Sequence, residues 1–285
     1  AVFWMLVSGV LFIAVTALVK FMGPRLPAPE AAFIRYAMGL VFLLPALRMI
    51  AQSDLSRRQY GLFATRGMCH ALGVILWFFA MTKIPIAEVT AMNYMVPIYV
   101  TLGAALFLGE RLAARRIAAI CVALVGALVI LRPGIREVSI GHIAMIGTAL
   151  FFAASYIVAK PLAGRVSPTV VVGMLSITVT IGLLPFAIAV WVPPTTAQLF
   201  GLLLVAAFAT AGHYSMTLAF RAAPMAVTQP VTFLQLVWSS LVGLVFFAEP
   251  IDIWVVFGGT LIMASVCFIA WREMMLSKRR SQAAE

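Results

Sequence analysis

The chain of 285 residues is 64% hydrophobic and only 10% charged, and its mean hydropathy is +1.10. A soluble domain is about half apolar and a quarter charged, so this composition excludes a soluble globular protein. The longest polar segment is the tail after Trp271, which leaves no room for a soluble domain beside the apolar blocks. The sequence therefore predicts an all-α membrane protein.

A helix that crosses the bilayer needs about 20 mostly apolar residues. Blocks of this kind follow one another along the chain, and we predict ten transmembrane helices. The first block ends in Lys20 without a small-residue cleavage pattern, so we expect the first helix of a chain whose start has been trimmed, not a signal peptide. The expected helices cover residues 2–20, 31–50, 61–82, 87–109, 113–131, 139–159, 169–192, 198–220, 225–247 and 253–272.

The net charge of +11 raises the question of a nucleic-acid partner. With both termini in the cytoplasm, the cytoplasmic loops and tail hold 13 Lys and Arg residues and the opposite loops hold 5. This asymmetry obeys the positive-inside rule, so the basic residues set the orientation and no nucleic-acid partner is expected. We predict a multi-pass protein of the inner (cytoplasmic) membrane with both termini cytoplasmic.

The sequence carries no arrangement that is typical of an enzyme or a metal site. Cys69, Cys121 and Cys267 lie inside apolar blocks, with neither CxxC spacing nor clustered histidines. A membrane enzyme would need a nucleophile, a base and an orienting group in one cluster, and neither a Ser/His/Asp set nor HExxH is present. We expect no catalytic activity, no cofactor and no bound metal.

The two halves of the chain repeat each other at a shift of 139 residues, which places KIPIAEVTAMNYMVPIYVTLGAALFLGE on AAPMAVTQPVTFLQLVWSSLVGLVFFAE. Five helices per repeat is an odd number, so the second copy enters the membrane upside down. The expected repeats are residues 1–132 and 139–272, followed by a basic cytoplasmic tail at 273–285, and such inverted repeats suit alternating access. The matching pairs are Pro85 with Pro224, Ala87 with Ala226, Phe107 with Phe246, and Glu110 with Glu249.

Each five-helix repeat has a Pro-x-Ala sequence at the start of its fourth helix and a Glu at the end of that helix. This pattern resembles the drug/metabolite transporter superfamily. Within it the chain is similar to EamA-type exporters, including the YddG-like amino-acid exporters. The resemblance covers essentially the whole chain and implies a transporter that works by export. The second copy reads AEPIDIW, without the basic linker that usually follows the Glu, and this departure fits a loop that faces outward.

All nine acidic residues lie in loops or at the ends of the expected helices. A proton-coupled antiporter commonly relies on a buried carboxylate, so we expect facilitated transport or coupling by other means. A purely cationic substrate is disfavoured as well, because no fixed negative charge would replace its hydration.

The stretch RGMCHALGVILWFFAM places Arg66, His70, Gly73 and Trp77 on one face of the third helix. His70 falls near mid-depth, where it either lines a cavity or bonds to a neighbouring helix. Arg66 is close enough to the helix end to anchor at the membrane interface, or it lines a vestibule. Gly73 leaves room either for a ligand or for a close helix crossing.

Polar and aromatic side chains also share faces on four other helices. The ninth helix carries Thr228, Thr232, Gln235 and Ser239, and such a face must meet protein or water and not lipid. Each face alone could be contact between helices, and together they predict a shared central cavity. Its expected substrate-binding residues are His70, Trp77, Asn93, Tyr94, Tyr99, Tyr156, His213, Tyr214, Gln235 and Trp238.

Two prolines, Pro97 and Pro230, are expected to interrupt the fourth and ninth helices and to act as hinges. The predicted cavity holds aromatic rings and two imidazoles but no carboxylate. Aromatic faces hold an ammonium group, and His, Asn or Arg donors hold a carboxylate. The predicted function is export of small zwitterionic metabolites, foremost amino acids, with a multidrug or quaternary-ammonium exporter as the alternative. The expected partners are the small-molecule substrate and the lipid bilayer.

Overall fold

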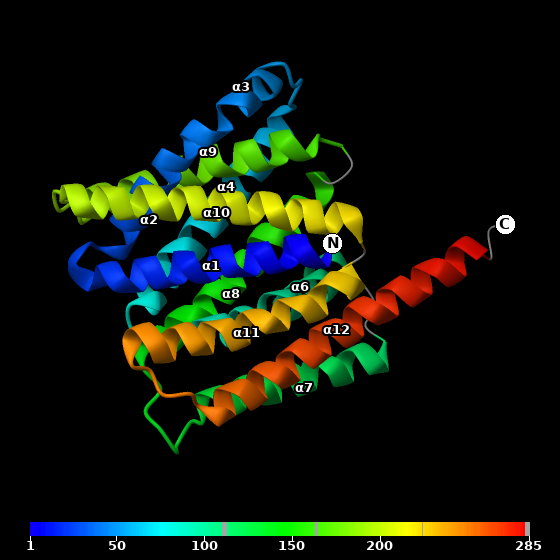
Figure 1. The fold of residues 1–285 in the computed structure, drawn as a ribbon. Helices are drawn as coiled ribbons and strands as arrows, with labels where there is room; N and C mark the ends of the chain where they lie inside the picture. Colours follow the sequence, from blue (N-terminus) through cyan, green and yellow to red (C-terminus); the bar gives the residue numbers. More distant parts are fainter. Residues whose placement is uncertain (110–112, 163–164, 224, 283–285) are drawn as a thin grey trace. The chain divides into compact units, whose positions relative to one another are not determined.

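The computed structural model describes residues 1–109, 113–162, 165–223 and 225–282. Its regular structure in these residues is entirely helical apart from one isolated bridge between Pro133 and Arg136, which confirms the prediction of an all-α chain. The α-helices are α1 (Val2–Met22), α2 (Ala28–Gly39), α3 (Leu44–Ala51), α4 (Arg57–Met81), α5 (Ile86–Asn93), α6 (Val96–Leu108), α7 (Ala114–Leu131), α8 (Ile140–Ala159), α9 (Pro168–Ala189), α10 (Thr196–Ala222), α11 (Met225–Phe247) and α12 (Ile253–Gln282) (Figure 1).

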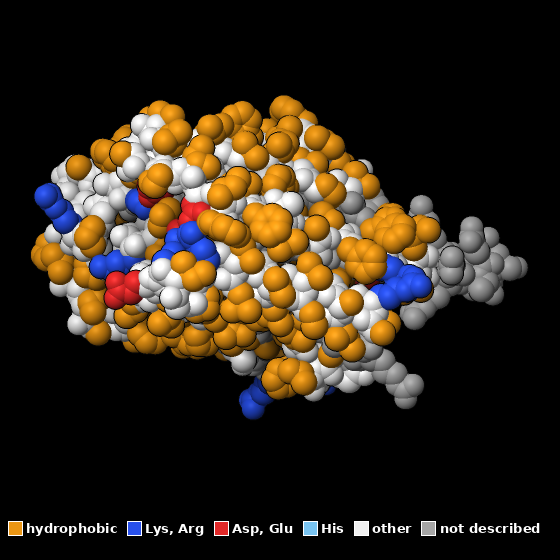
Figure 2. Space-filling model, turned by 90° about the horizontal axis from the view of Figure 1, so that it is seen from below, with side chains coloured by type: hydrophobic (Ala, Val, Ile, Leu, Met, Phe, Trp, Pro, Cys, Tyr) orange, Lys and Arg blue, Asp and Glu red, His pale blue; other side chains and the backbone are white. Residues whose placement is uncertain are grey.

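Nine helical segments within the described residues are long and apolar enough to cross a membrane, one fewer than the expected ten. Hydrophobic side chains make up most of the surface in Figure 2, and the Lys, Arg, Asp and Glu side chains gather in small groups. A surface of this kind suits a hydrocarbon environment, because lipid replaces water as the solvent of the exposed apolar groups. Ten spans and an inverted repeat stay predictions.

The expected helix at residues 31–50 is not continuous. It is divided into α2, a 3₁₀ turn at Leu40–Leu43 and α3, so no part of it is long enough to be counted as a span. Pro45 lies in the first turn of α3. Because proline lacks the backbone N–H, it fits the first turn of a helix but not its interior, which agrees with a new helix starting here.

The two predicted hinge prolines differ in their effect on the backbone. Pro97 lies in the first turn of α6, directly after the turn at Tyr94 and Met95 that separates α6 from α5, so the predicted interruption is present. Pro230 lies inside α11, which stays continuous, so the predicted interruption there is wrong. Pro230 is the sixth residue of α11, so the one backbone hydrogen bond that it removes lies near the start of the helix.

The chain forms two compact units, each built from segments of both sequence halves. Unit 1 comprises Ala1–Ala14, Pro85–Val138 and Ala211–Glu285. Unit 2 comprises Val15–Ile84 and Ser139–Thr210.

Unit 1 is held together by close contact between α7 and α12, which run side by side in Figure 1. Gly126 allows this approach, because a Cβ at that position would lie 2.7 Å from the carbonyl oxygen of Gly258. Small residues let transmembrane helices pack backbone to backbone. The last turns of α12 extend through residues 273–282 of the predicted tail, where Glu273 forms a 2.7 Å ion pair with Arg116 of α7.

Charged side chains join three segments at one end of unit 1. Arg136, in the turn after α7, donates to both carboxylate oxygens of Glu88 in the first turn of α5, at 2.9 and 2.7 Å. Asp252, just before α12, forms an ion pair with Arg132 and lies 3.7 Å from Arg136. The hydrogen bond with Glu88 raises the pKa of Arg136, so this guanidinium keeps its charge.

Glu249 has a structural role in the same unit. Its Oε2 accepts the backbone N–H of Ile86 at 2.9 Å, which satisfies one of the unbonded donors at the start of α5 and places a negative charge at the positive end of the helix dipole. Its repeat partner Glu110 and the proline Pro224 lie outside the described residues.

Unit 2 is organised around α4, which packs against α2, α8 and α9. Gly73 of α4 meets α8, because a Cβ at that position would lie 2.6 Å from Cδ1 of Phe152. Of the two alternatives for Gly73, the structure therefore shows the close helix crossing. This crossing fixes the face of α4 that carries the predicted site residues.

Candidate functional site

The predicted site residues divide between the two units. Unit 2 contains His70 and Trp77 of α4 and Tyr156 of α8. Unit 1 contains the remaining seven, which are Asn93, Tyr94, Tyr99, His213, Tyr214, Gln235 and Trp238.

His70 lies among aromatic rings contributed by two neighbouring helices. Phe152 of α8 stacks on the imidazole with a centroid distance of 4.7 Å and an interplanar angle of 27°. Tyr36 of α2 approaches its edge at 6.4 Å and 83°. His70 is only 8% exposed, so these rings enclose it. These aromatic neighbours come from the second and sixth expected helices.

Two buried arginines belong to the same unit. Arg35 and Arg66 are each 7% exposed, and the guanidinium of Arg35 lies over the ring of Tyr36 at 4.0 Å. Nη1 of Arg66 contacts the carbonyl oxygen of Val171 in α9 at 3.5 Å, the long limit of a hydrogen bond. Arg66 is thus enclosed by protein, which does not agree with an anchor that extends to the surface.

Neither arginine has an ion-pair partner among the residues that the structure describes. An uncompensated buried cation is costly, and such groups in a membrane protein are functional candidates by default. Nε of Arg66 is itself buried without a hydrogen-bond partner in the described part of the chain. The pair therefore leaves donor capacity that an anionic group could use.

Further donors lie on the neighbouring turns of α4 and α8. The indole of Trp77 contacts Phe152 edge to face at 6.3 Å, and its Nε1 is buried without a hydrogen-bond partner within the described residues. Ser155 is fully buried, and its Oγ also has no hydrogen-bond partner within the described residues. Tyr156 is adjacent to Ser155 and is 44% exposed. We define Arg35, Tyr36, Arg66, His70, Trp77, Phe152 and Ser155 as the α4 cluster.

In unit 1, Tyr94 has a structural contact, because its hydroxyl donates to the carbonyl oxygen of Thr232 at 2.9 Å and joins the turn after α5 to α11. Asn93, the preceding residue, has a buried Oδ1 without a partner in the described chain, and is the most suggestive polar group of this unit. Gln235 of α11 lies against α1, with its Cβ 3.8 Å from the position that a Cβ on Gly9 would take.

The other unit 1 candidates are more open. His213 contacts Phe12 edge to face at 4.9 Å. Tyr214 and Trp238 are 66% and 48% exposed, and Tyr99 is partly buried. Thr228 and Ser239 of the predicted polar face are fully buried, so this part of α11 meets protein.

Five members of the α4 cluster were not among the predicted substrate-binding residues: Arg35, Tyr36, Arg66, Phe152 and Ser155. Arg35 carried a usable signal, since it is a basic residue well inside an expected span, as Arg66 is. Phe152 carried none, because one more Phe in an apolar helix is indistinguishable from lipid-facing or core residues. No group of three or more His, Cys, Asp or Glu that could hold a metal is present in the described chain.

A family model described as the EamA-like transporter family matches residues 1–132 and again residues 139–271. The chain is 31% identical to a riboflavin transporter of Rhizobium johnstonii, over 97% of this chain and 92% of that protein. It is 28% identical to a pseudopaline exporter of Pseudomonas aeruginosa, over 89% of this chain and 90% of that protein. A solved structure titled "Crystal structure of protein" shares the fold, with a TM-score of 0.61 and 18% identity over 93% of this chain and 95% of that one.

Proposed function

The chain belongs to the EamA-like transporter family and is a membrane transporter, and we propose that it exports small metabolites that carry a carboxylate group. The foremost substrates are zwitterionic amino acids with neutral or aromatic side chains, carried by alternating access. The α4 cluster of unit 2 forms the part of the binding site that holds the carboxylate.

The observation that carries this proposal is the pair of buried arginines without an acidic partner in the described residues. A guanidinium binds a carboxylate through two parallel N–H···O bonds, which are roughly twice as strong as bonds between neutral groups. A bound carboxylate would therefore offset the cost of burying Arg66. A structural arginine would be expected to have this compensation within the protein itself.

The aromatic members of the α4 cluster support the proposal that the substrates have neutral or aromatic side chains. His70, Phe152 and Trp77 supply ring faces and edges, and Trp77 adds an unused N–H donor. Rings of this kind suit neutral or aromatic side chains and can attract an ammonium group. The alternative of a quaternary-ammonium exporter fits less well, because a permanent cation would be repelled by Arg35 and Arg66.

A second candidate function is transport of flat heteroaromatic metabolites. It is favoured by the relative named as a riboflavin transporter, together with the stacked and edge-on rings around His70. A flat ring could stack in the place of an aromatic amino-acid side chain, while Arg66 and Trp77 donate to its oxygen atoms.

Counterflow into reconstituted vesicles tests these assignments. The panel contains tryptophan, leucine, riboflavin and a quaternary ammonium compound, and the proteins are the parent, Arg66→Gln, Arg66→Lys and the control Arg58→Gln. Arg58 is an exposed residue near the start of the same helix, so its substitution removes an equal charge outside the cluster. We expect counterflow of the amino acids by the parent and Arg58→Gln, and a loss of about ten- to hundredfold in Arg66→Gln.

Arg66→Lys should recover only part of this loss, because lysine keeps the charge but not the two-pronged geometry. The thermal stability of Arg66→Gln should stay at or above that of the parent, since an uncompensated buried charge has been removed. Counterflow of riboflavin alone would favour the second candidate. Counterflow of the quaternary ammonium compound that survives Arg66→Gln would contradict the proposal.

A further inference from the structure

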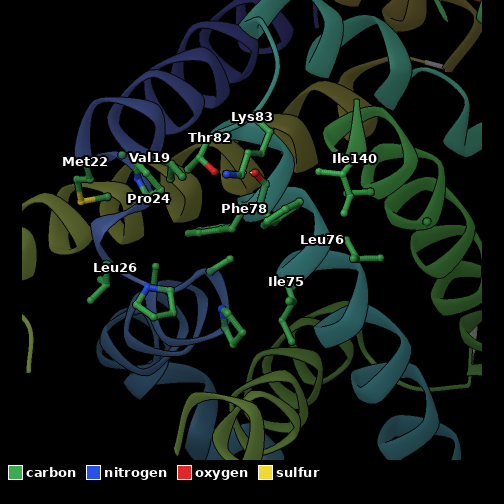
Figure 3. A pocket seen from close by; sticks show the side chains of 18 of the residues that line it. Val19, Met22, Pro24, Leu26, Ile75, Leu76, Phe78, Thr82, Lys83 and Ile140 are labelled. Atoms are coloured by element: carbon green, nitrogen blue, oxygen red, sulfur yellow. Dashed lines mark hydrogen bonds between the residues drawn. The ribbon is translucent and has the colours of Figure 1, made fainter. Parts of the chain in front are cut away.

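A separate cavity of about 820 Å³ lies within unit 2, between the end of α1, the start of α2, the end of α4 and the start of α8 (Figure 3). Its volume is in the range of ligand-binding cavities, which is about 300 to 1,000 Å³. None of the members of the α4 cluster lines it. Its walls are formed mainly by apolar side chains, among them Val19, Met22, Leu26, Ile75, Phe78 and Ile143.

The polar side chains that line the cavity are Thr82 and Lys83, which lie together in Figure 3. The hydroxyl of Thr82 donates to the carbonyl oxygen of Phe79 at 2.8 Å. Lys83 is exposed, with Nζ 5.5 Å from the ring of Phe79. Lys20 belongs to the same end, because its Nζ donates to the carbonyl oxygen of Ile84 at 2.7 Å. The cavity is therefore apolar along its walls and positively charged at one end.

The depth of the cavity matches one leaflet of a membrane. Lys83 follows the last turn of α4, and Ile75 lies eight residues before it, which corresponds to about 12 Å along a helix. One leaflet contributes about 15 Å of the hydrocarbon core, half of its thickness of about 30 Å. A side chain that follows a transmembrane helix, such as Lys83, lies near the level of the lipid headgroups.

The cavity is also open to the surface beside the start of α8. Ile140 and Ile143 of α8 both line it, and they are 64% and 60% exposed. Exposed apolar side chains of this size in a membrane-spanning helix are suited to contact with lipid tails. A lipid could therefore enter from the side.

We propose that this cavity binds an anionic phospholipid, with one acyl chain along the apolar walls and the phosphate group at Lys83. A zwitterionic solute would lose the hydration of its charges against these walls without gaining hydrogen bonds. An acyl chain has no such cost, and the positive end supplies the charge that a phosphate requires. The site is distinct from the α4 cluster and does not depend on the identity of the transported substrate.

Native mass spectrometry of the purified, delipidated full chain tests the proposal, with dioleoyl phosphatidylglycerol and dioleoyl phosphatidylcholine added in turn. Lys83→Gln removes the charge at the cavity, and Arg58→Gln removes an equal charge at the other end of α4. Ala28→Phe adds a ring to the cavity wall at the start of α2. The melting temperature of each variant in detergent shows whether it is folded.

We expect the parent and Arg58→Gln to retain phosphatidylglycerol in preference to phosphatidylcholine. Lys83→Gln should bind phosphatidylglycerol about fivefold more weakly and lose the preference. Ala28→Phe should lose both lipids at an unchanged melting temperature. The proposal is overturned if Lys83→Gln keeps the preference, if a folded Ala28→Phe binds both lipids as the parent does, or if a transported amino acid displaces the lipid competitively.

Discussion

His70 of α4 lies flat against Phe152 of α8, with ring centroids 4.7 Å apart. The two residues are in different sequence halves but in the same compact unit. Gly73, one turn along α4, makes the arrangement possible, since any Cβ there would press on the Phe152 ring. The contact ties the orientation of the imidazole to the packing of two helices, so binding and stability can be separated by choosing the substitution.

Substitution of His70 by Phe should retain the aromatic packing on Phe152 and remove the ring nitrogens. If His70 bonds to a charged group of the substrate, the loss is roughly 1.5 to 3 kcal/mol, or about ten- to hundredfold in affinity. We expect counterflow to fall by that factor while the melting temperature stays close to that of the parent. His70→Ala should lower both the counterflow and the melting temperature, because it also leaves a cavity beside Phe152. Normal transport by a folded His70→Phe protein would show that His70 only connects helices.

Gly73→Ala should destabilise the protein by about 1 to 3 kcal/mol, because the added methyl group overpacks the crossing with Phe152. The matched control is Gly61→Ala in the same helix, where a Cβ would meet nothing within 4 Å. This control should be neutral or stabilising, since alanine favours a helix by up to about 1 kcal/mol over glycine. Thermal unfolding in detergent measures the stability of both variants. Equal changes in stability for Gly73→Ala and Gly61→Ala would mean that the helix crossing at Gly73 is looser than described.

The ion pair between Glu88 and Arg136 should contribute more to stability than the one between Glu273 and Arg116. The Glu88 side chain is 4% exposed and that of Glu273 is 56% exposed. Glu88→Gln leaves Arg136 with an incomplete set of partners and should lower the free energy of unfolding by about 3 kcal/mol. Glu273→Gln should change it by less than about 1 kcal/mol. A comparison of chemical unfolding midpoints would reveal the difference, and a larger effect at Glu273 would contradict the assignment.

Pro97→Ala should slow turnover more than it weakens substrate binding. The turn between α5 and α6 is the point where a bending motion needs least distortion, and alanine would allow one continuous helix there. Pro230→Ala is the control, because α11 is already continuous at Pro230. Steady-state flux and equilibrium binding, measured on the same preparations, separate the two effects. An equal loss of affinity in Pro97→Ala would instead assign Pro97 to the binding site.

Reporter fusions test the predicted orientation. The distribution of Lys and Arg predicts that both termini are cytoplasmic, so a reporter after the SKRR sequence at 277–280 should be active only as a cytoplasmic fusion. A reporter in the loop at 133–138 should give the opposite result. An extracytoplasmic tail would contradict the count of ten spans and the inversion of the second repeat.

The sequence by itself determined the features that depend on neighbours along the chain. Runs of apolar residues predicted an all-helical membrane protein, because a helix satisfies its own backbone within one segment. The 3.6-residue period placed His70, Gly73 and Trp77 on one face of α4. Pro97 predicted a break in the fourth helix for an equally local reason, the missing N–H of proline.

Only the tertiary structure decided which faces meet. The neighbours of His70 are Tyr36 and Phe152, which lie 34 residues before it and 82 residues after it along the chain. Likewise, Glu88 pairs with Arg136 and Glu249 caps the helix that starts at Ile86. These partners depend on how the side chains of whole helices fit together, and lipid is as apolar as the side chains that compete for each contact. Hydrophobicity therefore determines which segments form membrane helices, while the shape of the side chains and a few buried charges determine which helices pack together.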